Sequence, residues 1–179
     1  THAPVGADQK QHLELTRDIA QKFNKDFNCN NFFPIPEPLI QKNISRVMSL
    51  RDGEKKMSKS DESDYSRVNL KDSADEILKK IKKAKTDSSP IPESLQELQG
   101  RPEASNLLNI YSDVTRVSLE EVLKQFSGKE FSFFKTKLSE VLVETICPIG
   151  KKMKKLLDDK NFLEKILKKG QQNASKRAE

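Results

Sequence analysis

The sequence predicts an α/β fold up to about residue 70 and an all-α fold from residue 71 onward. Two observations lead to this prediction. In the first part, short apolar segments lie between proline-rich and Asp-Gly turn signals and accompany one long helical pattern. From Ser73 onward, apolar residues recur at helical spacing, and two Ser-x-x-Glu pairs have the offset of helix capping boxes. With 179 residues, the chain can bury one good core or two modest cores that share an interface.

The first long helical pattern covers residues 8–24. Its apolar stripe consists of Leu13, Leu15, Ile19, Ala20 and Phe23. Asp8 and Gln11 lie three positions apart, which is the spacing of a capping pair at a helix start. We therefore expect a helix with one buried face that begins near Asp8.

Three segments after this helix are predicted to be extended. Prolines at positions 34, 36 and 38 exclude a helix or a central strand, because proline cannot donate a ladder hydrogen bond, and they indicate a turn-rich connector. The segment "SRVMSL" at residues 45–50 is predicted to be a short buried strand. A further short extended piece is predicted for "SRVNL" at residues 66–70.

The rest of the chain is predicted to be helical. Ser73 and Glu76 form a predicted capping box before one helix, and Ser118 and Glu121 form another. The apolar faces are predicted to contain Ile77, Leu78, Ile81 and Ala84, then Leu107, Tyr111 and Val114, then Val122, Leu123 and Phe126, then Phe131, Phe134, Leu138, Val141 and Leu142.

Prolines and polar residues predict where these helices begin and end. Pro90 and Pro92 indicate a linker after the first of them. The helix that starts near residue 131 is expected to stop before Pro148, because a residue before proline is disfavoured in helical geometry. Asn161 and Glu164 are expected to cap the last, basic amphipathic helix.

Composition narrows the class of protein. The net charge of +6 and the pI near 9.2 permit a polyanionic partner without requiring one. Cys29 and Cys147 lie far apart without metal-like spacing, so we expect reduced thiols in a cytoplasmic protein and exclude a disulfide framework. No apolar run approaches the ~18 residues of a membrane span, and no signal-peptide layout is present, so a soluble protein is expected. The start without methionine suggests part of a longer protein.

The stretch "KKMSKSD" at residues 55–61 follows an Asp-Gly turn signal and has two interpretations. Taken alone, such a run is far more often a solvated loop than a phosphate clamp. However, it follows a strand-like segment, and a second turn with a glycine and a carboxylate, "PVGADQ", opens the first helix. In open α/β sheets, ligands bind at the carboxyl ends of strands, and helix N-termini hold anions. Together the two turns predict a nucleotide-binding site.

Three motifs resemble the bacterial-type tryptophanyl-tRNA synthetases, a family of class I aminoacyl-tRNA synthetases. They are "PVGADQKQH" at residues 4–12, "RVMSL" at 46–50 and "KMSKS" at 56–60. The resemblance continues through "KKIKKAKTDS" and "SNLLNIYS" and covers nearly the whole chain. It implies that residues 1–70 are the C-terminal part of a Rossmann-like nucleotide-binding domain with the KMSKS loop, and that residues 71–179 are a helical domain on the anticodon side of the tRNA.

The resemblance implies activation of tryptophan by ATP and transfer of the adenylate to tRNA. Lys56 and Lys59 are the implied catalytic residues, which would stabilise negative charge on the departing phosphates. Ser58 and Ser60, with the backbone N–H groups of the loop, would donate hydrogen bonds to ATP. Met57 would be the apolar anchor that seats the closed loop. All five residues are therefore expected to bind ATP.

The turn before the first helix and the segment at residue 47 carry the other implied contacts. Gly6 would let the backbone approach the nucleotide. Asp8 would accept from the ribose hydroxyls, although without the resemblance it is equally well a helix cap. Gln9 would contact tryptophan, or otherwise be an exposed helix residue, and Val47 would meet the adenine through its backbone. The family usually has Glu at the position of Ala7, so only a backbone role in ATP binding is expected there.

The remaining expectations concern partners. His2 and His12 are too few for a metal site, and Mg²⁺ is expected to bind through the phosphates of ATP. The full-length enzyme is expected to be a homodimer that binds tRNA. The basic helices are either solvated faces or contacts to tRNA phosphates. Their lysines are Lys79, Lys80, Lys82, Lys83 and Lys85, then Lys151, Lys152, Lys154 and Lys155.

Two alternatives stay open at this point. The chain lacks a His-Ile-Gly-His type signature, which class I enzymes carry near the start of the nucleotide-binding domain, so a fragment that is inactive by itself is expected. A non-catalytic RNA-binding module that retains a synthetase scaffold is the first alternative. A different class I synthetase is the second, and the run from Asp8 to His12 disfavours it.

Overall fold

A computed structural model describes residues 2–6, 9–39 and 46–178 of the chain. The chain divides into two compact units, Thr1–Val47 and Met48–Glu179, and each is described by itself. The structure is mostly helical and contains a small parallel sheet. The compact units divide after Val47, which is a different division from the predicted domain boundary at residue 70. That domain boundary stays a prediction. Within the described ranges, no helix is both long and apolar enough to cross a membrane.

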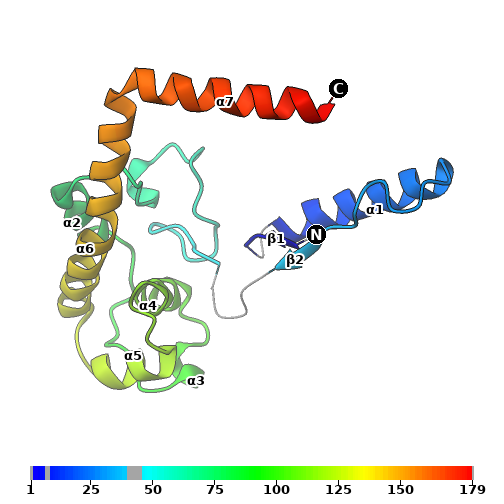
Figure 1. The fold of residues 1–179 in the computed structure, drawn as a ribbon. Coiled ribbons are helices and arrows are strands. Elements are labelled where there is room, and N and C mark those ends of the chain that lie inside the picture. The colour runs from blue at the N-terminus through cyan, green and yellow to red at the C-terminus, as the bar shows by residue number, and fades with distance from the viewer. Residues whose placement is uncertain (1, 7–8, 40–45, 179) are drawn as a thin grey trace. The chain divides into compact units, whose positions relative to one another are not determined.

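The first unit has a β-α-β order (Figure 1). Its elements are β1 (His2–Pro4), α1 (Lys10–Asp26) and β2 (Glu37–Leu39). The two strands pair in parallel, with Ala3 opposite Pro38. The guanidinium of Arg17 on α1 donates to the carbonyl of Pro36 at 2.8 Å, which ties the helix to the residue before β2. A proline lies in β2, as edge strands allow, because both strands of this sheet are edges.

Helix α1 confirms the predicted helix but buries little of its apolar stripe. Ala20 is buried, whereas the side chains of Leu15 and Ile19 are 59% and 61% exposed. The predicted capping pair includes Asp8, which lies outside the described residues. Gln9 is the observed N-cap residue and makes no side-chain cap hydrogen bond. The apolar face of α1 is therefore only partly buried in this unit.

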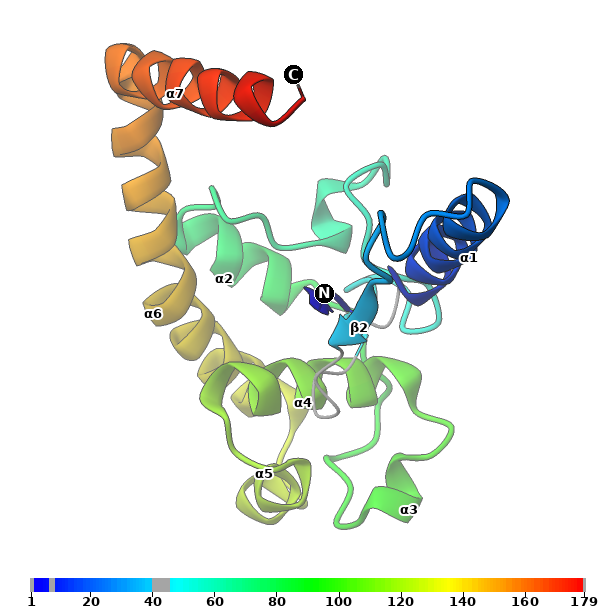
Figure 2. The same ribbon diagram turned by 45° about the vertical axis from the view of Figure 1, so that its right-hand side comes forward.

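The second unit, Met48–Glu179, contains the helical core and is termed the helical unit. Its elements are η2 (Asp64–Ser66), α2 (Ala74–Lys82), α3 (Leu95–Leu98), α4 (Pro102–Thr115), α5 (Leu119–Phe126), α6 (Phe131–Asp158) and α7 (Lys160–Ala178). The long helix α6 packs along α2 and also contacts α4 (Figures 1 and 2). Three buried rings join α4, α5 and α6, since the centroid of Phe126 lies 5.2 Å from that of Tyr111 and 4.9 Å from that of Phe134.

Both predicted capping boxes are confirmed. Ser73 accepts from the backbone N–H of Glu76, whose carboxylate accepts from the N–H of Ser73 at 2.7 Å. Ser118 and Glu121 form the same pair at the start of α5. These reciprocal bonds satisfy N–H groups that a helix start otherwise leaves without a partner.

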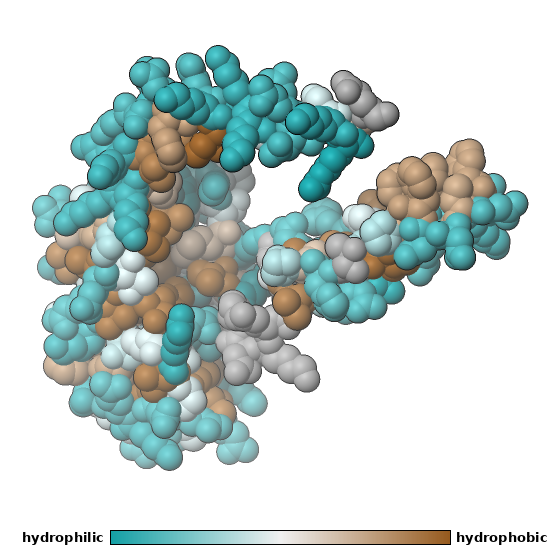
Figure 3. All heavy atoms as spheres, in the orientation of Figure 1, coloured by the Kyte–Doolittle hydropathy of each residue, from teal (hydrophilic) through white to brown (hydrophobic). Residues whose placement is uncertain are grey.

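The last two helices differ from the prediction. Helix α6 runs through Pro148 to Asp158 instead of stopping. Proline removes one backbone donor, and its ring crowds the carbonyl of residue 144, but the packing of this helix of 28 residues outweighs that local cost. At the start of α7, Asp159 accepts from the N–H of Phe162 at 3.0 Å, so the predicted cap at Asn161 was wrong. No described residue of α7 is buried, and hydrophilic side chains cover most of this helix in Figure 3.

The predicted strand at residues 45–50 was also wrong for the part that the structure describes. Met48 forms an isolated antiparallel bridge with Lys56, and residues 46–50 form no named strand. The segment 66–70 is not a strand either, because it begins at the end of η2 and continues irregularly. The short helix α3 lies within the predicted linker and is capped by Ser94.

Gly150 on α6 provides a test of how tightly this helix packs. A Cβ at Gly150 would lie 2.6 Å from the carbonyl oxygen of Leu70, which is too close for a backbone neighbour. We expect Gly150→Ala to lower the free energy of unfolding by about 1–2 kcal/mol, net of its gain in helix propensity. Gly170→Ala on α7 is the matched control, because a Cβ there meets no atom within 4 Å. Thermal unfolding followed by circular dichroism should show a lower Tm for the first variant only, and equal Tm values would contradict the packing.

Candidate active site

The segment before the KMSKS motif doubles back on itself in a tight turn. The N–H of Ser49 donates to the carbonyl of Lys55 at 2.7 Å, next to the bridge between Met48 and Lys56. At the tip, the carboxylate of Asp52 accepts from the N–H of Glu54 at 3.1 Å. This bond lowers the pKa of Asp52 below its ordinary value of 3.8. The turn is therefore ordered by backbone and carboxylate hydrogen bonds, as the Asp-Gly signal suggested.

Gly53 brings this turn against the start of helix α4. A Cβ at Gly53 would lie 2.5 Å from backbone atoms of both Pro102 and Glu103, so only glycine fits without displacement. Beside it, the Lys85 ammonium lies 2.7 Å from the carboxylate of Glu103. The ammonium lowers the pKa of Glu103, and the same pair raises the pKa of Lys85. The turn and α4 therefore pack together through a close backbone contact that a charge pair flanks.

The five KMSKS residues combine one anchored side chain with two exposed lysines. Met57 is half-buried and packs against the hydrophobic core of the helical unit. The hydroxyls of Ser58 and Ser60 lie 2.8 Å apart, and the N–H of Ser60 donates to Ser58 at 3.2 Å. Lys56 and Lys59 are exposed. The loop thus presents cations and hydroxyls at the surface, on a base held by an apolar side chain.

A charge network holds the chain that follows the motif. The buried ammonium of Lys80 on α2 lies 2.6 Å from the carboxylates of both Asp64 and Asp72. Burial opposes the charge on Lys80, but the two carboxylates outweigh it and raise the pKa of the ammonium. Lys80 in turn lowers the pKa of Asp64. Lys80 was expected on a solvated or RNA-binding face, and this expectation was wrong because its side chain lies in the protein core.

The other predicted site residues belong to the first unit. Gly6 is exposed, and its carbonyl accepts from the N–H of Gln9 at 3.0 Å, just before α1. Val47 is 38% exposed. Ala7 and Asp8 lie outside the described residues. The roles of these five residues stay predictions.

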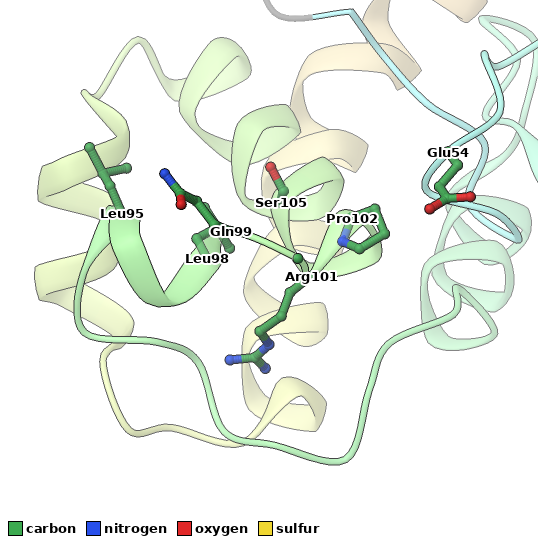
Figure 4. A pocket seen from close by; sticks show the side chains of 8 residues that line it. Glu54, Leu95, Leu98, Gln99, Arg101, Pro102 and Ser105 are labelled. Carbon is green, nitrogen blue, oxygen red and sulfur yellow. The ribbon is translucent and has the colours of Figure 1, made fainter.

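A shallow hollow of 410 Å³ lies beside the turn (Figure 4). It is lined by Glu54, Leu95, Leu98, Gln99, Gly100, Arg101, Pro102 and Ser105. The guanidinium of Arg101 binds both carboxylate oxygens of Asp87, at 2.9 and 2.6 Å, and thereby lowers the pKa of Asp87. None of the described residues predicted to bind ATP or tryptophan lines this hollow. Nor does the described part of the chain group three or more His, Cys, Asp or Glu side chains as a metal site would require.

Comparison with known proteins identifies the family. Residues 1–146 match the family of tRNA synthetases class I (W and Y). The chain belongs to this family. It is 56% identical to the tryptophan–tRNA ligase of Caulobacter vibrioides over 178 residues, and 51% identical to that of Rickettsia conorii over 175 residues. These matches cover 99% and 98% of the chain but 52% of each relative, so the chain spans about half the length of the curated relatives it matches.

Solved structures of this family resemble the chain. The tryptophanyl-tRNA synthetase of Mycoplasma pneumoniae gives a TM-score of 0.71 at 33% identity, over 86% of this chain and 48% of that one. The enzyme of Campylobacter jejuni complexed with ADP and tryptophan gives a TM-score of 0.64 at 26% identity, over 98% of this chain and 52% of that one. The resemblance to the synthetases predicted from the sequence is thereby confirmed.

Two buried polar residues that contact the chain before and after the KMSKS motif, Asn106 and Lys80, were not identified from the sequence. Asn106 on α4 is 5% exposed, and it lies between the buried residues Ala104 and Leu107. Lys80 lies on the same stripe as Ile77, Ile81 and Ala84, which are all buried. In both cases the available signal was a polar residue at a core position of a helical pattern. Such residues are normally buried only with a hydrogen-bonding or charged partner.

The charge pair beside the turn predicts a pH dependence. Because the pKa of Glu103 is lowered from 4.5 in the folded chain, its contribution to stability is present above about pH 4.5 and is lost as the pH falls through the folded pKa. We expect the free energy of unfolding of the wild type to decrease in this window, and that of Glu103→Gln to decrease less. Urea unfolding from about pH 6 to about pH 3 measures both free energies. The exposed Glu144→Gln should keep the wild-type slope, and an unchanged slope in Glu103→Gln would contradict the assignment.

Proposed function

We propose that this chain is the C-terminal half of a tryptophan–tRNA ligase. The observation that carries the proposal is the KMSKS segment, in a chain that is 56% identical to such a ligase over 178 residues. The full-length enzyme is this chain together with the part that matches the other half of its relatives. It activates tryptophan with ATP and transfers it to tRNA. The half that this chain represents is inactive by itself, because it lacks the His-Ile-Gly-His type signature of class I enzymes.

Activation begins when a tryptophan carboxylate oxygen attacks the α-phosphorus of ATP. The new oxygen–phosphorus bond forms as the bond to pyrophosphate breaks, which leaves tryptophanyl adenylate. A terminal tRNA hydroxyl then attacks the carbonyl carbon, and AMP departs. Negative charge develops on the pyrophosphate oxygens in the first step, and the ammonium groups of Lys56 and Lys59 stabilise it. Ser58, Ser60 and the loop N–H groups donate further hydrogen bonds, while Met57 seats the loop. Mg²⁺ would be held through the phosphates of ATP, where it would supply further positive charge.

The first unit supplies contacts to the adenosine and to the amino acid. Gly6 lets the backbone approach the nucleotide, Ala7 contacts ATP through its backbone, and Asp8 accepts from the ribose hydroxyls. Val47 meets the adenine through its backbone. Gln9, the exposed N-cap residue of α1, contacts tryptophan. The ADP and tryptophan complex of the Campylobacter jejuni relative supports a site for these two ligands in the family.

The helical unit binds tRNA phosphates through its exposed lysines. They include Lys79, Lys82 and Lys83 on or after α2, and Lys151, Lys152, Lys154 and Lys155 on α6. Lys80 is excluded from this role because its ammonium is buried between two carboxylates. We place the tRNA anticodon on the side of residues 71–179, and we propose that the full-length enzyme is a cytoplasmic homodimer.

Lys59→Ala in the full-length enzyme tests the phosphate clamp. We expect the single-turnover rate of adenylate formation to fall by roughly 10²-fold or more, because a charge-assisted donor that acts in the transition state contributes a few kcal/mol. Lys55→Ala is the matched control, since Lys55 precedes the motif and pairs with Asp52 at 3.3 Å. An unchanged rate in Lys59→Ala would contradict the clamp. Binding of tRNA without any tryptophan-dependent pyrophosphate exchange by the wild type would instead favour an RNA-binding module.

A further inference from the structure

The chain before the KMSKS motif is attached to helix α4 through a side-chain amide. Asn106 Oδ1 accepts from the N–H of Met48 at 2.9 Å, and its Nδ2 donates to the carbonyl of the same residue at 2.9 Å. Nδ2 also lies 3.3 Å from the carbonyl oxygen of Ser49. Asn106 thus binds the backbone of Met48 on both its donor and its acceptor, across 58 residues of sequence.

Few bonds separate Asn106 from the first catalytic lysine. Met48, which Asn106 binds, is bridged to Lys56, and the N–H of Ser49 donates to the carbonyl of Lys55 at 2.7 Å. Displacement of Asn106 would therefore be transmitted to Lys56 through two backbone interactions. Because Asn106 is on α4, this helix fixes where the motif begins.

A second attachment holds the chain after the motif. Arg67 donates to the carbonyl of Asp61, the residue after the motif, at 2.9 Å and pairs with Asp64 at 3.0 Å. Asp64 is bound by the buried ammonium of Lys80 at 2.6 Å, and Asp72 holds that ammonium from the other side at 2.6 Å. The end of the motif is therefore linked to α2 through a chain of three charged groups.

We propose that Asn106 and Lys80 are positioning residues that hold the two ends of Lys56–Ser60 for ATP activation. This proposal rests on the function proposed above. Both side chains are nearly fully buried, with 5% and 4% of their surface exposed, so each acts through the backbone or side chains of the loop rather than on the nucleotide. A misplacement of about 1 Å in a group that acts on a transition state can reduce a rate by about 10²-fold. Lys56 and Lys59 are carried by this loop, so a shift of its backbone also shifts the two ammonium groups.

The main competing explanation is that these two buried polar residues contribute to stability alone. Three variants separate the explanations. Asn106→Ala removes the upstream attachment. Lys80→Met removes the downstream one with little change in side-chain length. Asp64→Asn weakens the link between Lys80 and Arg67, and it leaves the pair of Lys80 with Asp72 in place, so it keeps the test valid if Lys80→Met does not fold.

The first measurement is amide hydrogen exchange of residues 55–62 in the chain itself. We expect exchange in this segment to be faster by roughly tenfold or more in the variants than in the wild type, because their local opening becomes more favourable. Asn109→Ala and Asp75→Asn are the matched controls, since Asn109 donates to Ser105 on its own helix and Asp75 is exposed at the start of α2. Unchanged exchange in Asn106→Ala and Asp64→Asn would overturn the proposal.

The second measurement is tryptophan-dependent pyrophosphate exchange by the full-length enzyme. The proposal predicts a kcat lowered by roughly tenfold or more and a raised KM for ATP, with the KM for tryptophan unchanged. Activity lost only in proportion to unfolded protein, with both KM values unchanged, would show a structural role and overturn it. A wild type without activity would overturn the proposed function, whereas the hydrogen exchange result would still decide whether the attachments hold the loop.

Discussion

A side-chain amide completes the hydrogen bonding of the chain that leads into the KMSKS motif. Backbone N–H and C=O groups that are removed from water require partners, and Met48 finds both of its partners on Asn106. An asparagine amide has the same donor and acceptor as a peptide group, so it can take the place of a neighbouring strand. The chain before the motif, which is the base of the loop, is consequently held by a helix and not by a neighbouring strand.

This arrangement lets the loop carry exposed cations on a fixed base. Met57 supplies the apolar burial, and Gly53 allows the turn to contact the backbone of α4 directly. The buried charge of Lys80 is compensated by two carboxylates, as a charge in the core requires. Lys56 and Lys59 lie exposed at the surface, where a charge costs less than in the core.

Most of the helical architecture could be predicted from the sequence because its signals are local. The capping boxes at Ser73 and Ser118 lie within one helical turn, so four residues were enough to locate α2 and α5. The strand predicted around Met48 could not be assessed in this way, because a strand depends on a partner elsewhere in the chain. Pro148 also misled the prediction, since its local cost is outweighed by the packing of a helix of 28 residues.

The candidate site was predictable where it resembles a motif and not where it depends on tertiary contacts. Lys56, Met57 and Lys59 could be assigned from five consecutive letters. Asn106 and Lys80 could not, because nothing in their local sequence shows which backbone or carboxylate lies opposite them. Their only signal was a polar side chain at a buried helical position, which indicates that a partner exists without saying where.

Residues of the helical unit supply the hydrogen bonds described above for residues 48–56. Amide hydrogen exchange on the piece Met48–Glu179, compared with the whole chain, shows whether they suffice. The informative amides are those of Ser49 and Leu50, which donate to Lys55 and Ser66 at 2.7 and 2.8 Å. We expect both amides, and those of α2 and α4, to be protected equally in the piece and in the whole chain. Loss of protection at Ser49 and Leu50 with α2 and α4 still protected would contradict this expectation, because the base would then depend on residues 1–47.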